Sequence, residues 1–204
     1  MADTVGLTFN ETMRGPLALG ATDPVEGEKQ GRAAGSELAM HATIDIEDLE
    51  RFLDDADHAA KLSGTLDFTP WGEGLPAPRG VFNLFKPSGE EDLRLMVYEL
   101  AFAHEGQDYY MAGQKDVRND PILDLWKQTT TLYTRIHKGA DKSGPVVGAG
   151  VLTLGVTDLI RLVSTLHATG GTPVQRAEAV ARFGKFFMGQ LWDTYVKHSP
   201  VPTE

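Results

Sequence analysis

The chain has 204 residues, which is enough for one domain with a substantial hydrophobic core. Its formal net charge of −10 argues against binding to nucleic acid, because phosphate backbones are bound by clusters of Lys and Arg. It contains no cysteine, which excludes disulfides, thiol nucleophiles and cysteine–metal sites. The amino-terminal residues lack the features of a signal peptide, and no apolar run approaches the roughly 20 residues of a membrane helix. We therefore expect a cytoplasmic protein without a membrane span.

The first third of the chain predicts two strands, a long loop and a helix. Strands are expected at 7–13 and 38–44, where polar and apolar residues alternate. Residues 14–35 are rich in Gly, Pro and charge, so we expect a loop that is mobile at 26–30. The stretch 46–62 carries apolar residues at helical spacing, which predicts an amphipathic helix.

The rest of the chain predicts further strands and then helices. Strands are expected within 64–74, 80–89, 93–103, 108–117, 129–138 and 144–156, with a hairpin turn at 104–107 and a loop at 118–128. Helices are expected at 157–171 and 174–198, followed by a disordered tail at 199–204. The predicted fold class is α+β, mainly antiparallel β, as a sandwich or barrel with two or three helices.

The chain also contains a weak internal repeat. Residues 43–53 align without gaps with residues 153–163, and 8–15 align with 132–139. A duplication would place half-repeats 1–64 and 124–170 about a pseudo-two-fold axis inside a single domain, 1–204. Chance similarity between two strand–helix units is the alternative.

Several segments carry a family resemblance. They include FNETMRG (9–15), MVYELAF (96–102), DLWKQTTTLYTRIHKG (124–139) and RFGKFFMGQLWDTY (182–195). In these segments the chain resembles an uncharacterised domain associated with cholesterol-oxidase-like GMC flavoproteins and with α/β-hydrolase fusions. The resemblance implies an accessory role beside steroid or lipid oxidation. It carries no catalytic residue, and no GxGxxG motif follows a strand, so no flavin or other cofactor is expected.

Polar residues within apolar strands are the candidates for catalysis. Glu99 lies in the run MVYELAF, where a carboxylate must be paired, exposed at an edge or directed into a cavity. His41 and His137 lie in predicted strands, and a histidine–carboxylate pair could transfer protons. Satisfied or surface side chains are the alternative. The acidic run 54–58 lacks the spacing of a calcium loop, so no metal site is expected.

Apolar and hydroxyl side chains suggest where a ligand could lie. The strand at 93–103 is apolar on both faces, so we expect the sheet to be covered on both sides, one of them by a cavity or a second sheet. Candidate ligand-binding residues are Thr129, Thr131, Tyr133, Phe82 and Tyr98. The last helix is apolar on more than one face, which makes Phe186 and Trp192 candidate interface residues.

Three hypotheses follow. The first is a non-enzymatic accessory domain that binds an apolar, steroid- or lipid-like ligand or docks a GMC-type, flavin-dependent oxidoreductase. The second is a small cofactorless isomerase or cyclase acting on a steroid- or polyketide-like substrate. The third is a structural protein–protein interaction domain, and homo-oligomerisation stays open.

Overall fold

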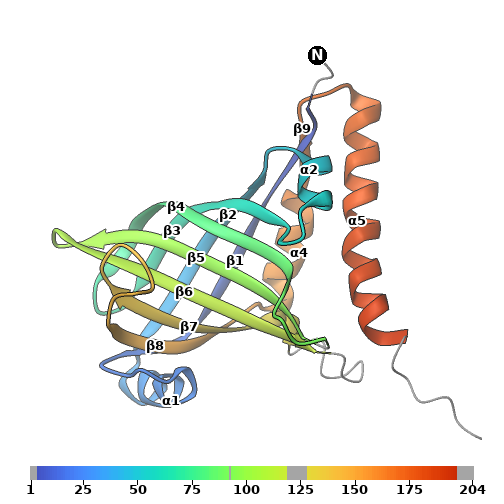
Figure 1. The fold of residues 1–204 in the computed structure, drawn as a ribbon. Helices are drawn as coiled ribbons and strands as arrows, with labels where there is room; N and C mark the ends of the chain where they lie inside the picture. The colour runs from blue at the N-terminus through green and yellow to red at the C-terminus, as the bar shows by residue number, and fades with distance from the viewer. Residues whose placement is uncertain (1–3, 92, 119–127, 197–204) are drawn as a thin grey trace, which may run out of the picture.

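The computed structural model describes residues 4–91, 93–118 and 128–196, with side chains described as far as residue 189 (Figure 1). The elements follow one another along the chain as β1 (Gly6–Leu19), α1 (Pro24–Ala34), β2 (Glu37–Ile46), α2 (Leu49–Asp54), β3 (Ala59–Phe68), β4 (Gly72–Pro87), β5 (Leu93–His104), β6 (Gln107–Arg118), β7 (Thr131–Lys138), β8 (Val146–Thr153), α4 (Val156–Thr165), β9 (His167–Thr169) and α5 (Pro173–Val196).

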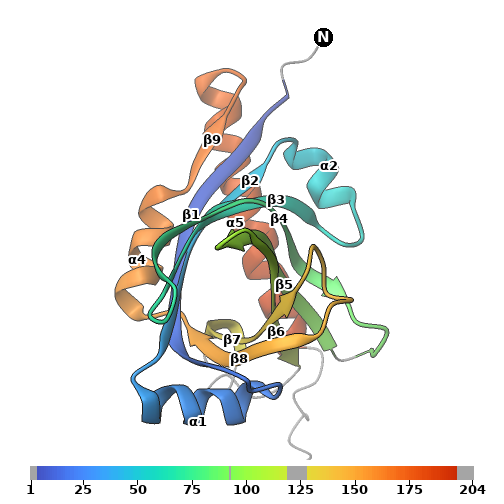
Figure 2. The ribbon, with the colours of Figure 1, turned by 90° about the vertical axis from the view of Figure 1, so that its left-hand side faces the viewer.

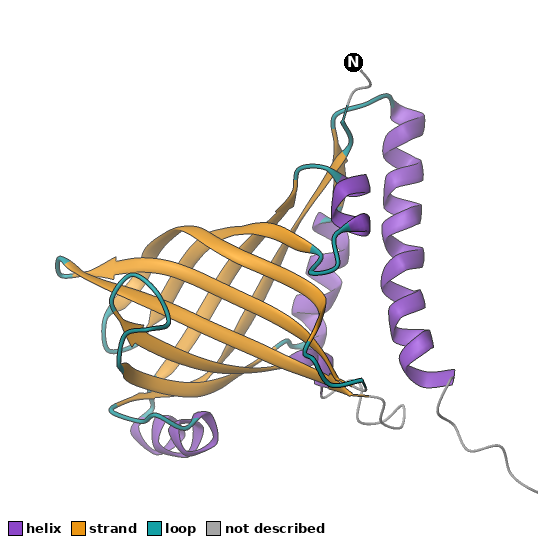
Figure 3. Ribbon diagram, viewed as in Figure 1, coloured by secondary structure: helices purple, strands orange, loops and turns teal. Residues whose placement is uncertain are grey.

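The strands form a closed antiparallel barrel. Consecutive strands from β2 through β8 pair with one another, and β1 pairs with both β2 and β8, which closes the sheet. The short strand β9 adds to the start of β1, where Gly6 lies opposite Thr169. The α+β, mainly antiparallel prediction is confirmed, and of the two architectures expected it is the barrel that forms (Figure 3).

Alternation along the strands fills the barrel with side chains. Every second residue of a strand points inward, and these positions carry bulky apolar groups that are almost fully buried. Examples are Met13, Met40, Phe68, Phe82 and Leu100.

Helices cover one end of the barrel and part of its outside. Phe183 of α5 lies 6.0 Å from Phe9 and 6.3 Å from Phe52, measured between ring centroids, so α5 and α2 close the end at which β1 begins (Figure 1). Helix α4 lies along β1, and α1 lies along β1 and β8 (Figure 2).

The predicted loop at 14–35 is wrong. β1 continues to Leu19, and residues 24–34 form helix α1. Asp23 caps the helix by accepting a hydrogen bond from the Glu26 backbone N–H, and Gly35 ends it in the left-handed conformation. The two internal glycines that lower helix propensity, Gly27 and Gly31, are the residues through which α1 contacts the barrel backbone.

Three other predicted elements are displaced, and the first is the helix expected at 157–171, which ends at Thr165 because residues 167–169 pair with β1 as strand β9. The helix expected over 46–62 is confined to α2, because Ile46 ends β2 and Ala59 already begins β3. The strand expected from residue 129 begins at Thr131, and residues 128–130 are helical.

The internal repeat stays a prediction. Residues 43–53 run from β2 into α2 and residues 153–163 run from β8 into α4, so both copies are strand–helix units. The two strands, β2 and β8, are the neighbours of β1 within the closed barrel. The tail at 199–204 and the side chain of Trp192 lie outside the described residues.

Candidate functional site

The outer face of β4 to β7 differs from the rest of the barrel surface. On β1 to β3 the outward positions are polar, as at Thr12, His41 and Thr65. On β4 to β7 they include Val81, which is 42% exposed, and Tyr133, which is 36% exposed. Among the described helices, none lies along β4 to β6 (Figure 2). Apolar side chains therefore face outward where no described helix covers them.

Strand register arranges this face into rows. One row crosses the four strands as Val81, Glu99, Ala112 and Arg135. The next row consists of Asn83, Val97, Gln114 and Tyr133. These rows form the floor of an open groove of about 880 Å³, which is also lined by Leu95 and by the start of α1 at 23–25. We call it the outer groove.

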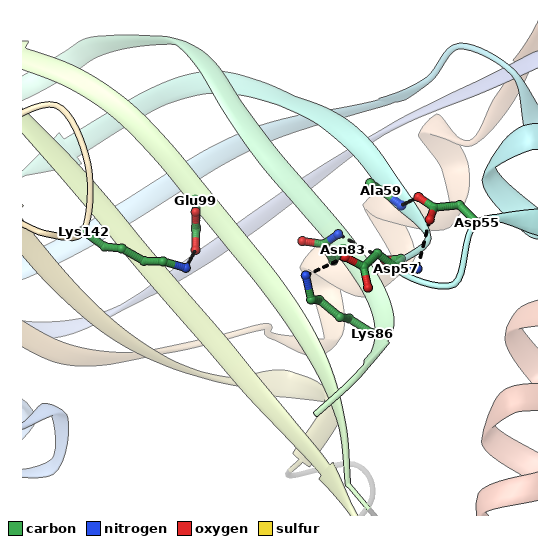
Figure 4. A network of polar contacts seen from close by, with 7 residues as sticks. All are labelled: Asp55, Asp57, Ala59, Asn83, Lys86, Glu99 and Lys142. Carbon is green, nitrogen blue, oxygen red and sulfur yellow. Dashed lines mark hydrogen bonds and ion pairs between the residues drawn. The ribbon is translucent and has the colours of Figure 1, made fainter. Parts of the chain in front are cut away.

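An ion pair marks one end of the outer groove (Figure 4). The Glu99 carboxylate accepts a hydrogen bond of 2.6 Å from the Tyr110 hydroxyl and one of 3.0 Å from Lys142 Nζ. Burial, and secondly the hydrogen bond to Glu99, raise the pKa of the Tyr110 hydroxyl far above neutral pH. Tyr110 therefore remains a hydrogen-bond donor at physiological pH, and both Glu99 oxygens are occupied.

A second ion pair marks the other end. Lys86 Nζ lies 2.6 Å from Asp57 Oδ2, and the Asn83 side-chain amide donates to the Asp57 carbonyl at 3.1 Å (Figure 4). Asp55 holds the same loop by accepting from the backbone N–H groups of Asp57 and Ala59. The hydrogen bond from Ala59, followed by that from Asp57, lowers the pKa of the Asp55 carboxyl. The polar groups at this end are thus fixed by the α2–β3 connection.

Three residues predicted from the sequence line the outer groove together: Glu99, His137 and Tyr133. His137 Nδ1 lies 2.9 Å from the Gly144 carbonyl oxygen, which ties β7 to the loop that carries Lys142. Glu99 is paired, which is one of the three situations expected for a carboxylate in an apolar strand, and its partners are Tyr110 and Lys142.

His41 lies on a different part of the barrel. Its Nδ1 is 3.2 Å from the Thr12 hydroxyl and its Nε2 is 2.9 Å from Asp67 Oδ2, on the polar outer face of β1 to β3. A single pocket containing His41 together with Glu99 and His137 is therefore not formed.

Two predicted ligand residues point into the barrel. Phe82 and Tyr98 are each 1% exposed, and their rings meet edge to face at 5.0 Å. The Tyr98 hydroxyl donates to Glu11 at 2.7 Å, and Lys115 Nζ donates to Glu11 at 3.0 Å and to Tyr98 at 3.1 Å. We call Glu11, Tyr98 and Lys115 the interior triad.

Sequence reasoning missed the interior triad, although a signal was present. Lys115 alternates with Met111, Gly113 and Val117, so it shares the inward face of β6, and Glu11 likewise alternates with apolar residues of β1. A charged residue on the inward face of each of two strands predicts a buried pair. Burial, more than the adjacent Glu11, raises the pKa of the Tyr98 hydroxyl well above its usual value.

Three other predicted residues, Thr131, Thr129 and Phe186, lie outside the outer groove. Thr131 faces outward on β7, opposite Thr153 of β8, and Thr129 belongs to the helical turn before β7. Phe186 is half-buried and contacts Phe52 and His58 at the covered end of the barrel.

The described part of the chain contains neither a metal-binding cluster nor a helix that could span a membrane. No group of three or more His, Asp or Glu residues there is arranged to hold a metal ion. No helix in the same residues combines the length and the apolar character needed to cross a membrane.

Compared with protein-family models, curated proteins and solved structures, the chain has no match.

Proposed function

We propose that this protein is a non-enzymatic binding domain that holds a small ligand with an apolar body in the outer groove. The observation that carries the proposal is the outer groove itself, where exposed apolar side chains of β4 to β7 lie between two ion pairs and no described helix runs along β4 to β6. A concave apolar surface with a few fixed polar groups is the usual form of a ligand site.

Burial energetics support binding at this place. Covering apolar surface contributes roughly 25 cal/mol per Å², or about 2.5 kcal/mol for every ~100 Å² removed from water. Val81 and Tyr133 are 42% and 36% exposed, so a ligand lying across them removes surface that the fold leaves wet. The ion pairs at both ends are already formed and need no rearrangement.

The filled interior favours the outer groove over a site inside the barrel. Phe82, Tyr98 and Leu100 are at most 1% exposed, and they contact their neighbours inside the barrel. A ligand inside would have to displace such side chains, which costs several kcal/mol in a close-packed core.

The resemblance described above bears on the natural ligand. It favours a steroid or another lipid as the bound molecule and a flavin-dependent oxidoreductase as a partner. Native mass spectrometry of freshly purified protein would give the ligand class as a mass that is lost on denaturation.

A fluorescent probe tests the proposal. Phenylnaphthylamine is a neutral aromatic molecule whose emission rises in apolar surroundings. We expect it to bind the protein, and we expect Val97→Glu to weaken that binding at least tenfold by placing a charge on the floor of the outer groove. The matched control is Val163→Glu, which makes the same change at an outward position of α4 that is 64% exposed. Absence of binding to the native protein, or a loss confined to Val163→Glu, would refute the proposal.

A cofactorless isomerase is the second candidate, because Glu99, His137 and Tyr133 share the outer groove. A general base needs a free carboxylate oxygen within reach of the substrate, whereas both Glu99 oxygens accept hydrogen bonds. The test is Glu99→Gln: the enzyme hypothesis expects turnover of a steroid ketone to vanish, and unchanged turnover would remove Glu99 from the reaction.

A further inference from the structure

We infer that the outer groove selects ligands with an anionic head group and that Arg135 binds this group. The inference rests on the proposed function and specifies its ligand class. It comes from the distribution of charge partners along the outer groove.

Three cations line the outer groove, and two of them are neutralised. Lys86 is paired with Asp57 and Lys142 with Glu99. Within the described residues, Arg135 has no carboxylate within 4.0 Å. It is therefore the cation of the outer groove whose charge a ligand can meet.

The Arg135 side chain is oriented without being neutralised. Its Nε donates to the Thr22 carbonyl oxygen at 3.2 Å, just before helix α1. This contact uses one of the five guanidinium N–H groups and leaves the terminal nitrogens for a carboxylate or sulfonate. Arginine binds such groups through two parallel hydrogen bonds, which gives both strength and orientation.

Strand register places this cation beside an apolar path. Arg135 lies opposite Ala112, whose small side chain separates it from Glu99 on the next strand. Val97 and Tyr133 follow in the neighbouring row. A head group at Arg135 therefore allows an apolar body to lie over Ala112 toward Val97.

The electrostatics of the outer groove also suit an anion. Its lining contains three carboxylates, Asp23, Glu99 and Asp116, and three cations, Lys86, Arg135 and Lys142. The formal charge of these six lining groups is zero, and it becomes −1 when Asp57, the partner of Lys86, is counted, in a chain whose net charge is −10. Glu99 is paired with Lys142, while Asp23 accepts from the Glu26 backbone N–H and Asp116 accepts from the Gln114 side chain, so each carboxylate of the lining already has a partner other than Arg135.

Two probes with one ring skeleton test the inference. Anilinonaphthalene sulfonate carries a sulfonate that phenylnaphthylamine lacks. We expect the native protein to bind the sulfonate about tenfold more tightly than the neutral probe, since charge-assisted hydrogen bonds are worth at least this factor. Arg135→Gln should remove that preference, so that the two probes bind the variant with equal affinity, and circular dichroism of the variant shows that it is folded. Added salt should reduce the preference in the native protein.

A second arginine provides the matched control. Arg14 is exposed on the outer face of β1, outside the outer groove, and Arg14→Gln changes the net charge by the same amount. An equal loss of sulfonate binding in both variants would trace the preference to net charge and overturn the inference. Equal affinity of the two probes for the native protein would also overturn it while the proposed function stands. Failure of the neutral probe to bind at all would instead refute the proposed function.

Discussion

The interior triad is a buried charge pair whose removal should have a large effect. Glu11 and Lys115 are 3% and 1% exposed, and Tyr98 is 1% exposed. Lys115 Nζ also lies 4.7 Å from the centroid of the Tyr98 ring. Each group therefore has its partners inside the barrel and little contact with water.

We predict that Lys115→Met destabilises the protein strongly. Methionine keeps most of the volume of the lysine chain, so little cavity is created, while Glu11 loses its cation and keeps only the Tyr98 hydrogen bond. Removing one partner of a buried pair costs about 3–5 kcal/mol. A domain of this kind has about 5–15 kcal/mol of total stability, so a large fraction of it should be lost.

The second half of this prediction concerns the double variant. Glu11→Gln together with Lys115→Met removes both charges and keeps an acceptor for the Tyr98 hydroxyl. We expect it to regain at least about 2 kcal/mol relative to Lys115→Met alone, because neutralising both partners removes the unpaired charge. The measurement is urea unfolding followed by circular dichroism, analysed as a double-mutant cycle. A loss below about 1 kcal/mol in Lys115→Met, or additive effects in the double variant, would refute the reasoning.

Two further predictions concern the outer surface and the helix contacts. The hydrogen bond from the Gly74 backbone N–H, followed by that from His41, lowers the pKa of the Asp67 carboxyl below its usual 3.8. The ionised Asp67 carboxylate therefore stabilises the folded protein above pH 3.8, and this stabilisation is lost as the pH falls through the folded-state pKa. The difference in unfolding free energy between the native protein and Asp67→Asn should therefore shrink on acidification, and a difference that does not change with pH would contradict this. Gly27→Ala should destabilise by about 1–3 kcal/mol, because a Cβ there would overlap the Ala149 carbonyl oxygen. Gly184→Ala, where nothing lies within 4 Å of the added Cβ, should stabilise helix α5 by roughly 0.5–1 kcal/mol. If the melting temperatures of Gly27→Ala and Gly184→Ala shift in the same direction, the packing argument fails.

Local patterns predicted much of the secondary structure correctly. Alternation placed β5 and β6, and the turn between them falls at Glu105 and Gly106, which both adopt positive φ. Such patterns succeed because the two faces of a strand meet different environments at every second residue. Helix α1 was missed because Gly27 and Gly31 reduce local helix propensity, and the contact that compensates for them is made with strands far along the chain.

The candidate site could be predicted only in part. Glu99 and Tyr133 were conspicuous as single residues, but nothing in their spacing shows that they lie on adjoining rows of one groove. His41 was equally conspicuous, and the barrel places it on the polar face of β1 to β3.

The sequence by itself determined the fold class and the inward and outward faces of the long strands, because side-chain alternation is a local property. Only the tertiary structure decided the closure of the barrel, the partner of Lys115 and the position of Arg135 beside Ala112 on the floor of the outer groove. Glu11 and Lys115 are 104 positions apart, and their contact depends on the register of every strand between them. That register is set by the packing of the whole core, which no short segment contains.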